Sequence, residues 1–175
     1  MQRALEHLAT HDPVMAQLIA EHRRPQLEKH DNYYHELVSS IISQQLSVKA
    51  AGTIQRRFLE LFGDNFPEPA QIVTKDIESL RAVGLSRQKA SYVLDLATKI
   101  LDGTVDFSTI DRLTNDEIDA ELTRVKGIGV WTVHMFLIFC MGRLDVLPTG
   151  DLGIRNGVGK LYGFAGVPTP EEVEI

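Results

Sequence analysis

Apolar residues recur at intervals of three and four along almost the whole chain, and no stretch alternates apolar and polar residues for long enough to form a convincing sheet. This spacing lines one face of a helix, so it predicts an all-α fold. Several expected helices begin at capping residues: Ser47 precedes an amphipathic run, and Thr114 stands three residues before Glu117. We expect helices over residues 3–8, 13–21, 33–44, 48–62, 69–73, 75–83, 87–101, 106–112, 115–124, 130–140 and 152–162.

Composition limits the classes of protein to consider. The 175 residues, 43% hydrophobic and 24% charged, suffice for one compact domain or two small lobes that share a core. Cys140 is the only cysteine, so it has no disulfide partner, cannot hold an iron–sulfur cluster with other thiolates, and is expected in the core. No targeting segment or membrane span is recognisable, which predicts a soluble, intracellular protein. The net charge of −6 argues against a protein that coats nucleic acid, so any DNA contact must be local.

A pattern of helix, glycine turn and helix occurs twice, at residues 80–90 and at residues 122–139. The first copy is typical of an ordinary helix connection. In the second copy, Gly127 and Gly129 flank one apolar residue that can insert into the core, while both glycines leave backbone amides uncovered. Those amides precede the helix expected from Val130, where unpaired donors and the helix dipole favour an anion such as a DNA phosphate. The expected phosphate contacts are Lys126, Gly127, Gly129, Val130 and Thr132.

Three stretches together carry a resemblance to a known family. The sequence LTRVKGIG at 122–129, followed by Trp131 and Thr132, resembles the helix–hairpin–helix of DNA repair proteins. The sequence IISQQLS at 41–47 resembles the loop that helix–hairpin–helix DNA glycosylases insert into the duplex, and LPTGDLG at 147–153 resembles their catalytic segment. The order and separation of the three also fit. The chain therefore resembles the helix–hairpin–helix DNA glycosylase superfamily, of the 3-methyladenine DNA glycosylase II type, in a minimal form without the N-terminal β-rich domain.

The resemblance implies a repair enzyme that flips out alkylated purines, such as 3-methyladenine and 7-methylguanine, and hydrolyses their N-glycosidic bond to start base excision repair. Asp151 is the implied catalytic residue. Bond cleavage builds positive charge on the sugar, and a fixed carboxylate stabilises that charge in the transition state. Asp151 can also orient or deprotonate the attacking water, and it can cap the helix that follows. Asp145 is a competing acid that we instead expect in a loop salt bridge.

Gln45 occupies the implied DNA wedge position, with Gln44 and Leu46 beside it. From the residues alone, the two glutamines could equally end a helix as solvated side chains. Trp131 stands where strand-cleaving relatives carry a nucleophilic lysine, so the resemblance implies a monofunctional enzyme that uses water. The Trp131 indole either stacks on a flipped cationic base or packs in the core. Met135, where some relatives present an aromatic ring, and His134 complete the expected substrate pocket.

No cofactor is expected for the chemistry, and no iron–sulfur cluster. The resemblance implies that main-chain carbonyls of Thr123, Val125 and Ile128 hold Na⁺ or K⁺ at the hairpin. The histidines lack metal-ligand spacing. A local positive patch for DNA can come from Arg124, Lys126, Arg155 and Lys160.

The expected organisation is a single domain, residues 1–175, with a central helical lobe at about 39–140 and a second lobe from the N-terminal and C-terminal helices. Thr169 and Pro170 open a further helix, and the chain stops at Ile175, so we expect a truncated C-terminus relative to the family. The expected partner is double-stranded DNA with a damaged base, bound by a monomer, in the cytoplasm or nucleoid of a prokaryote or the nucleus of a eukaryote. A non-catalytic helix–hairpin–helix DNA-binding module and a purely structural helical bundle are the alternatives.

Overall fold

The computed structural model describes residues 2–23, 26–27 and 29–174, in which helices joined by turns and loops form the regular structure, with no strand. The all-α prediction is therefore confirmed. The helices are α1 (Gln2–His11), α2 (Pro13–Glu21), α3 (Tyr33–Ser43), α4 (Val48–Glu60), α5 (Pro69–Ile72), α6 (Ile77–Ala82), α7 (Arg87–Leu101), the 3₁₀ helix η1 (Ile110–Arg112), α8 (Asn115–Leu122), α9 (Val130–Phe139), α10 (Leu152–Leu161) and α11 (Pro170–Val173).

The helix ends follow the capping chemistry of the sequence. Thr114 accepts a hydrogen bond from the amide of Glu117, whose carboxylate accepts one from the Thr114 amide. The Ser47 hydroxyl caps α4 by accepting the Ala50 amide. The helix expected at 106–112 is wrong except for its last three residues. The Asp106 carboxylate accepts hydrogen bonds from the amide and hydroxyl of Ser108, and this local turn competes with helical hydrogen bonding.

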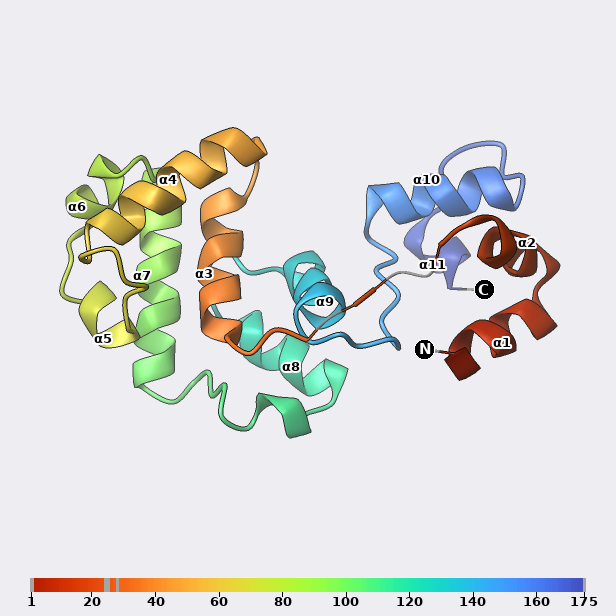
Figure 1. Cartoon of the computed structure of the whole chain (residues 1–175), viewed down its shortest axis with the longest axis horizontal. Helices are drawn as coiled ribbons and strands as arrows, with labels where there is room; N and C mark the ends of the chain where they lie inside the picture. Colours follow the sequence, from red (N-terminus) through yellow and green to blue (C-terminus); the bar gives the residue numbers. More distant parts are fainter. Residues whose placement is uncertain (1, 24–25, 28, 175) are drawn as a thin grey trace.

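The hydrophobic core lies among α3 to α9. Helix α7 packs against α3, α5 and α6, and α9 packs against α3 and α8 (Figure 1). The fully buried side chains come from these helices and their connections, and they include Leu37, Phe58, Leu80, Leu96 and Leu137. Cys140 is buried at the end of α9, as predicted. Helices α3 to α9 thus form one packed body, and this body holds the glycine hairpin between α8 and α9 in a fixed position.

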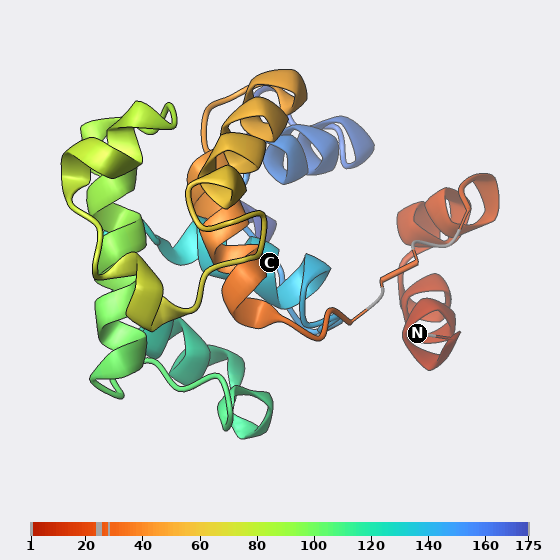
Figure 2. The ribbon, with the colours of Figure 1, turned by 60° about the vertical axis from the view of Figure 1, so that its left-hand side comes forward.

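Helices α1, α2, α10 and α11 lie outside that body. In both views, α1 and α2 lie away from the helices α3 to α9 (Figures 1 and 2). Neither α1 nor α2 has a buried residue, and the Tyr162 hydroxyl after α10 donates a hydrogen bond to Asp12 before α2. Arg155 of α10 donates to the Pro168 carbonyl oxygen at 2.6 Å, which fastens the segment before α11. In the described residues, no helix is both long and apolar enough to cross a membrane.

Candidate active site and DNA-binding surface

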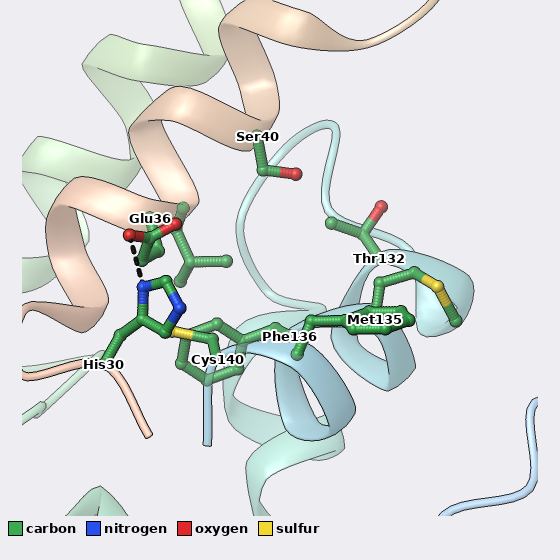
Figure 3. Close-up of a pocket in the computed structure, with 9 residues that line it drawn as sticks. His30, Glu36, Ser40, Thr132, Met135, Phe136 and Cys140 are labelled. Carbon is green, nitrogen blue, oxygen red and sulfur yellow. Dashed lines mark hydrogen bonds and ion pairs between the residues drawn. The ribbon is translucent and has the colours of Figure 1, made fainter. Parts of the chain in front are cut away.

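A groove runs between α3 and α9, and its two hollows meet at Ser40 and Thr132, which line both. Figure 3 shows the inner hollow, where Ser40 faces Thr132 across the opening and His30 and Glu36 stand at one end. The His30 Nδ1 atom lies 2.8 Å from the Glu36 carboxylate. The outer hollow is lined by Ser43, Gln44, Gln45 and Trp131, in addition to the two shared residues. The groove thus joins the expected substrate pocket to the expected wedge.

The periodicity of α9 decides which of its side chains reach the groove. A helical residue turns by about 100°, so Thr132, Met135, Phe136 and Phe139 share one face. His134 projects from the other side, where it lines a separate pocket with Asp119 and Asp145. The prediction of His134 as a pocket residue is therefore wrong, while Met135 does line the groove.

Asp151 stands immediately before α10 and uses its two carboxylate oxygens differently. The Oδ1 atom accepts the Ile154 amide at 2.9 Å and caps α10, and the Oδ2 atom accepts the Trp131 indole N–H at 2.6 Å. The indole hydrogen bond, helped by the Ile154 amide, lowers the pKa of Asp151 below its usual value. The carboxylate is therefore ionised at neutral pH and held beside the outer hollow. Asp151 therefore caps α10 and at the same time binds a residue that lines the groove.

Trp131 is 51% exposed, so the alternative of plain core packing is wrong. Its indole N–H fixes Asp151, and it also lines the groove. The competing acid Asp145 forms no salt bridge among the described residues; its backbone carbonyl accepts a hydrogen bond from Asn115. No lysine lines either hollow of the groove in the described chain.

The glycine hairpin is built as its sequence predicts. Ile128 is buried in the core, and Gly127 adopts a φ of +80°, a conformation that favours glycine. The amides of Gly127, Gly129 and Val130 find no acceptor within the described part of the chain. The Lys126 amide does find one, because it donates to the Asp95 carboxylate at 2.8 Å. The Lys126 side chain is exposed, and its ammonium lies 3.5 Å from the same carboxylate.

Thr132 of the expected phosphate set has its side chain in the groove, where it is the buried polar residue of α9. Its amide belongs to the first turn of α9, together with those of Val130 and Trp131. For the expected cation, the Val125 carbonyl accepts the Ile128 amide at 3.1 Å, whereas those of Thr123 and Ile128 accept no hydrogen bond from the described chain. No cluster of His, Cys, Asp or Glu in the described residues is arranged to hold a metal.

The wedge segment, residues 44–46, leaves the end of α3 in an unusual conformation. Gln45 has a φ of +56° and is exposed, and Leu46 is also exposed. Gln44 donates from its side chain to the Gly127 carbonyl oxygen at 3.0 Å. The glutamines therefore do end a helix, and one of them also ties this helix end to the hairpin.

Sequence reasoning missed several residues around the groove. Ser40, Glu36 and His30 line it, and Asp95 anchors the hairpin from α7. Ser40 and Glu36 stand on α3 upstream of the wedge segment, one turn apart, so helical spacing from Gln44 could have found them. Asp95 and His30 carry no such signal, because only the packing of α7 and of the segment before α3 brings them to the site.

The fold and the groove define a class of protein: a helical scaffold with exposed hairpin amides and an ionised carboxylate beside a groove. The model of the HhH-GPD superfamily of base excision DNA repair proteins matches residues 38–175, and the chain belongs to this family. The family expectation from the three motifs is therefore confirmed.

Similar proteins agree with this assignment. DNA-3-methyladenine glycosylase 1 of Schizosaccharomyces pombe is 37% identical over 89% of this chain and 69% of its own length. The solved S. pombe 3-methyladenine DNA glycosylase in complex with abasic DNA has a TM-score of 0.80 at 36% identity, covering 98% of this chain and 86% of that one. A DNA-3-methyladenine glycosidase from Bacillus halodurans has a TM-score of 0.85 at 35% identity, and the match covers 95% of this chain and 76% of that one.

Proposed function

We infer that the protein is a monofunctional alkylbase DNA glycosylase that removes alkylated purines from double-stranded DNA and so starts base excision repair. One observation carries the inference: the Asp151 carboxylate is held by the indole N–H of Trp131, and Trp131 itself lines the groove between α3 and α9. The names of the similar proteins support the reaction and the alkylated substrate.

In the proposed mechanism, the wedge segment enters the duplex and the damaged nucleotide rotates into the groove. Eversion costs a few kcal/mol and is cheapest at a damaged pair. As the glycosidic bond breaks, positive charge develops on the sugar, and the Asp151 carboxylate stabilises it. Water then completes the hydrolysis. The indole face of Trp131 offers a cationic base a stacking surface worth ~0.5–2 kcal/mol.

The hairpin supplies the proposed DNA contacts outside the groove. Free amides of Gly127, Gly129 and Val130 meet a backbone phosphate, with the Lys126 side chain beside them. A monovalent cation on the carbonyls of Thr123, Val125 and Ile128 would bridge the hairpin to that phosphate; it contributes to DNA affinity and not to bond cleavage. We propose that the protein acts as a monomer, in the compartment that holds the genome.

The test uses a duplex that contains one N7-methylguanine. We expect the protein to release free base and to leave the strand intact until alkali is added. Asp151→Asn should abolish release while duplex binding survives. Strand cleavage without alkali would contradict the monofunctional assignment. Tight duplex binding without any base release would favour the alternative, a non-catalytic helix–hairpin–helix module.

A further inference from the structure

Lys89 makes contacts that its own helix does not explain. It stands in the first turn of α7, where the positive end of the helix dipole disfavours a cation. Its ammonium donates to the carbonyl oxygen of Ile42 at 2.8 Å and to that of Gln44 at 2.6 Å. Both acceptors belong to the C-terminal end of α3, where unpaired carbonyls and the negative end of the dipole favour a cation. The position of Lys89 therefore benefits α3 and the segment that follows it.

The ammonium is partly buried and has no carboxylate partner among the described residues. Burial lowers its pKa, which means that its position costs solvation free energy. The two charge-assisted hydrogen bonds offset that cost, and both end on the backbone that leads into the wedge segment. A surface lysine with a general attraction for DNA would not need this arrangement.

The wedge segment is the part of the chain that requires such support. Gln45 holds a left-handed conformation that is unfavourable for a residue other than glycine, and such a conformation persists only where its surroundings determine it. Lys89 holds the carbonyl immediately before Gln45, and the Gln44 side chain holds the Gly127 carbonyl on the other side. The segment is therefore fixed between α7 and the hairpin before any DNA arrives.

We propose that Lys89 is a positioning residue for base eversion, which holds the wedge segment in its strained, duplex-penetrating shape and takes no part in bond cleavage. This proposal rests on the proposed glycosylase function. It predicts that a damaged base still paired in a duplex needs Lys89, whereas a base that is already unpaired does not. Preorganisation of the wedge segment raises the rate of base eversion and leaves the Asp151 carboxylate unchanged.

The test compares Lys89→Met with Arg87→Met under single-turnover conditions. Arg87 lies in the same helical turn and pairs with Glu78, so its loss removes an equal charge without touching the wedge segment. Base eversion is followed by the fluorescence of 2-aminopurine placed beside an N7-methylguanine, and base release is measured from duplex and from single strand. We expect Lys89→Met to slow base eversion and base release from duplex about 10-fold or more, which is the effect expected from the loss of a charge-assisted hydrogen bond. Release from single strand should not change, and Arg87→Met should behave as wild type.

Chemical rescue separates positioning from a folding defect. Lys89→Cys treated with 2-bromoethylamine regains an ammonium at almost the lysine position, and we expect eversion to recover. The native Cys140 is a poor competitor, since burial, with the nearby Glu36, raises the pKa of its thiol to about 12. Equal losses on duplex and single strand, unchanged eversion in Lys89→Met, or an equal defect in Arg87→Met would overturn the proposal.

A measurement without DNA keeps this proposal distinct from the proposed function. Amide hydrogen exchange of residues 44–46 should be faster in Lys89→Met than in wild type, while exchange in α7 is unchanged. If the wild-type protein releases no base from any substrate, the glycosylase function fails, and the exchange result still decides whether Lys89 holds the wedge segment. Unchanged exchange at residues 44–46 would refute that role.

Discussion

At the scale of single residues, Trp131 and Asp151 act as a pair. The sequence assigned the indole either to base stacking or to the core, and the structure instead directs its N–H to the Asp151 carboxylate at 2.6 Å. A donor to the ionised form of a carboxyl group favours that form, which is why the pKa of Asp151 lies below its usual value. The side chain proposed to stack on the base therefore also sets the charge of the proposed catalytic group.

Trp131→Phe tests this coupling, because it keeps an aromatic face and removes the N–H donor. Without the donor the pKa of Asp151 should rise, so the fraction of ionised carboxylate should start to fall at a higher pH. We expect the acid limb of the pH–rate profile for single-turnover base release to move to higher pH relative to wild type. Met135→Leu, on the same face of α9, is the control and should leave that limb in place. An unchanged acid limb in Trp131→Phe would separate the indole from the ionisation of Asp151.

At the scale of elements, the two hairpin glycines have different physical requirements. A Cβ atom at Gly127 would lie 2.0 Å from the Tyr92 ring, and the φ of +80° is unfavourable for any other residue. Gly127→Ala should therefore cost about 2 kcal/mol or more of the free energy of unfolding, through strain and overpacking. A Cβ at Gly129 meets nothing within 4 Å, so Gly129→Ala should fold with near-normal stability. Denaturant unfolding measures both, and equal losses would contradict this account.

Asp95 links α7 to the hairpin, and its side chain is only 14% exposed. Burial alone would raise its pKa, but hydrogen bonds from Lys99 and from the Lys126 amide outweigh burial and hold the pKa below its usual value. A lowered pKa contributes stability above the unfolded pKa of about 3.9, and this stability is lost as the pH falls through the lower folded value.

Asp95→Asn should therefore be less stable at neutral pH, by about 1–3 kcal/mol, because the amide cannot satisfy both lysine and backbone donors. The difference between wild type and variant should shrink as the pH falls below about 4, because Asp95 of the unfolded wild-type chain then takes up a proton, and it should be lost as the pH falls through the lower folded pKa. Urea unfolding at a series of pH values measures this difference. Asp102→Asn, at an exposed carboxylate at the end of the same helix, should show a smaller effect. A stability difference that does not change with pH would exclude the ion pair as its source.

Predictability from the sequence also differs between elements. The helices of the body follow from apolar spacing and from caps such as Ser47 and Thr114, because these signals are local. The helix predicted over residues 106–112 does not form in full, because the Asp106 side chain offers the backbone another hydrogen-bonding partner. Asp151 and the hairpin glycines were found because short motifs carry them. Lys89 and Asp95 were not, because each acts on a segment more than thirty residues away in the chain.

At the scale of the whole molecule, the negative net charge opposes the binding of DNA. The formal net charge is −6, and yet the proposed partner is a polyanion. Of the expected positive patch, Arg124, Lys126 and Lys160 are exposed, whereas Arg155 directs its Nε to the Pro168 carbonyl. Three of the four expected cations are therefore available to neutralise phosphates, within a molecule of negative net charge. Binding should depend on the hairpin amides and the wedge segment more than on bulk attraction.

The salt dependence of duplex affinity measures this balance. Each lysine or arginine that neutralises a phosphate adds about one to the slope of log K against log salt. We expect a shallow slope for the wild-type protein, and Lys126→Gln should lower its magnitude by about one, with weaker binding to every duplex sequence. Lys75→Gln, in the loop between α5 and α6, is the matched control and should leave the slope unchanged. The hairpin amides carry no net charge, so they release no counterions and cannot produce a steep slope themselves. A steep wild-type slope that is insensitive to Lys126 would therefore mean that DNA binds another face of the molecule.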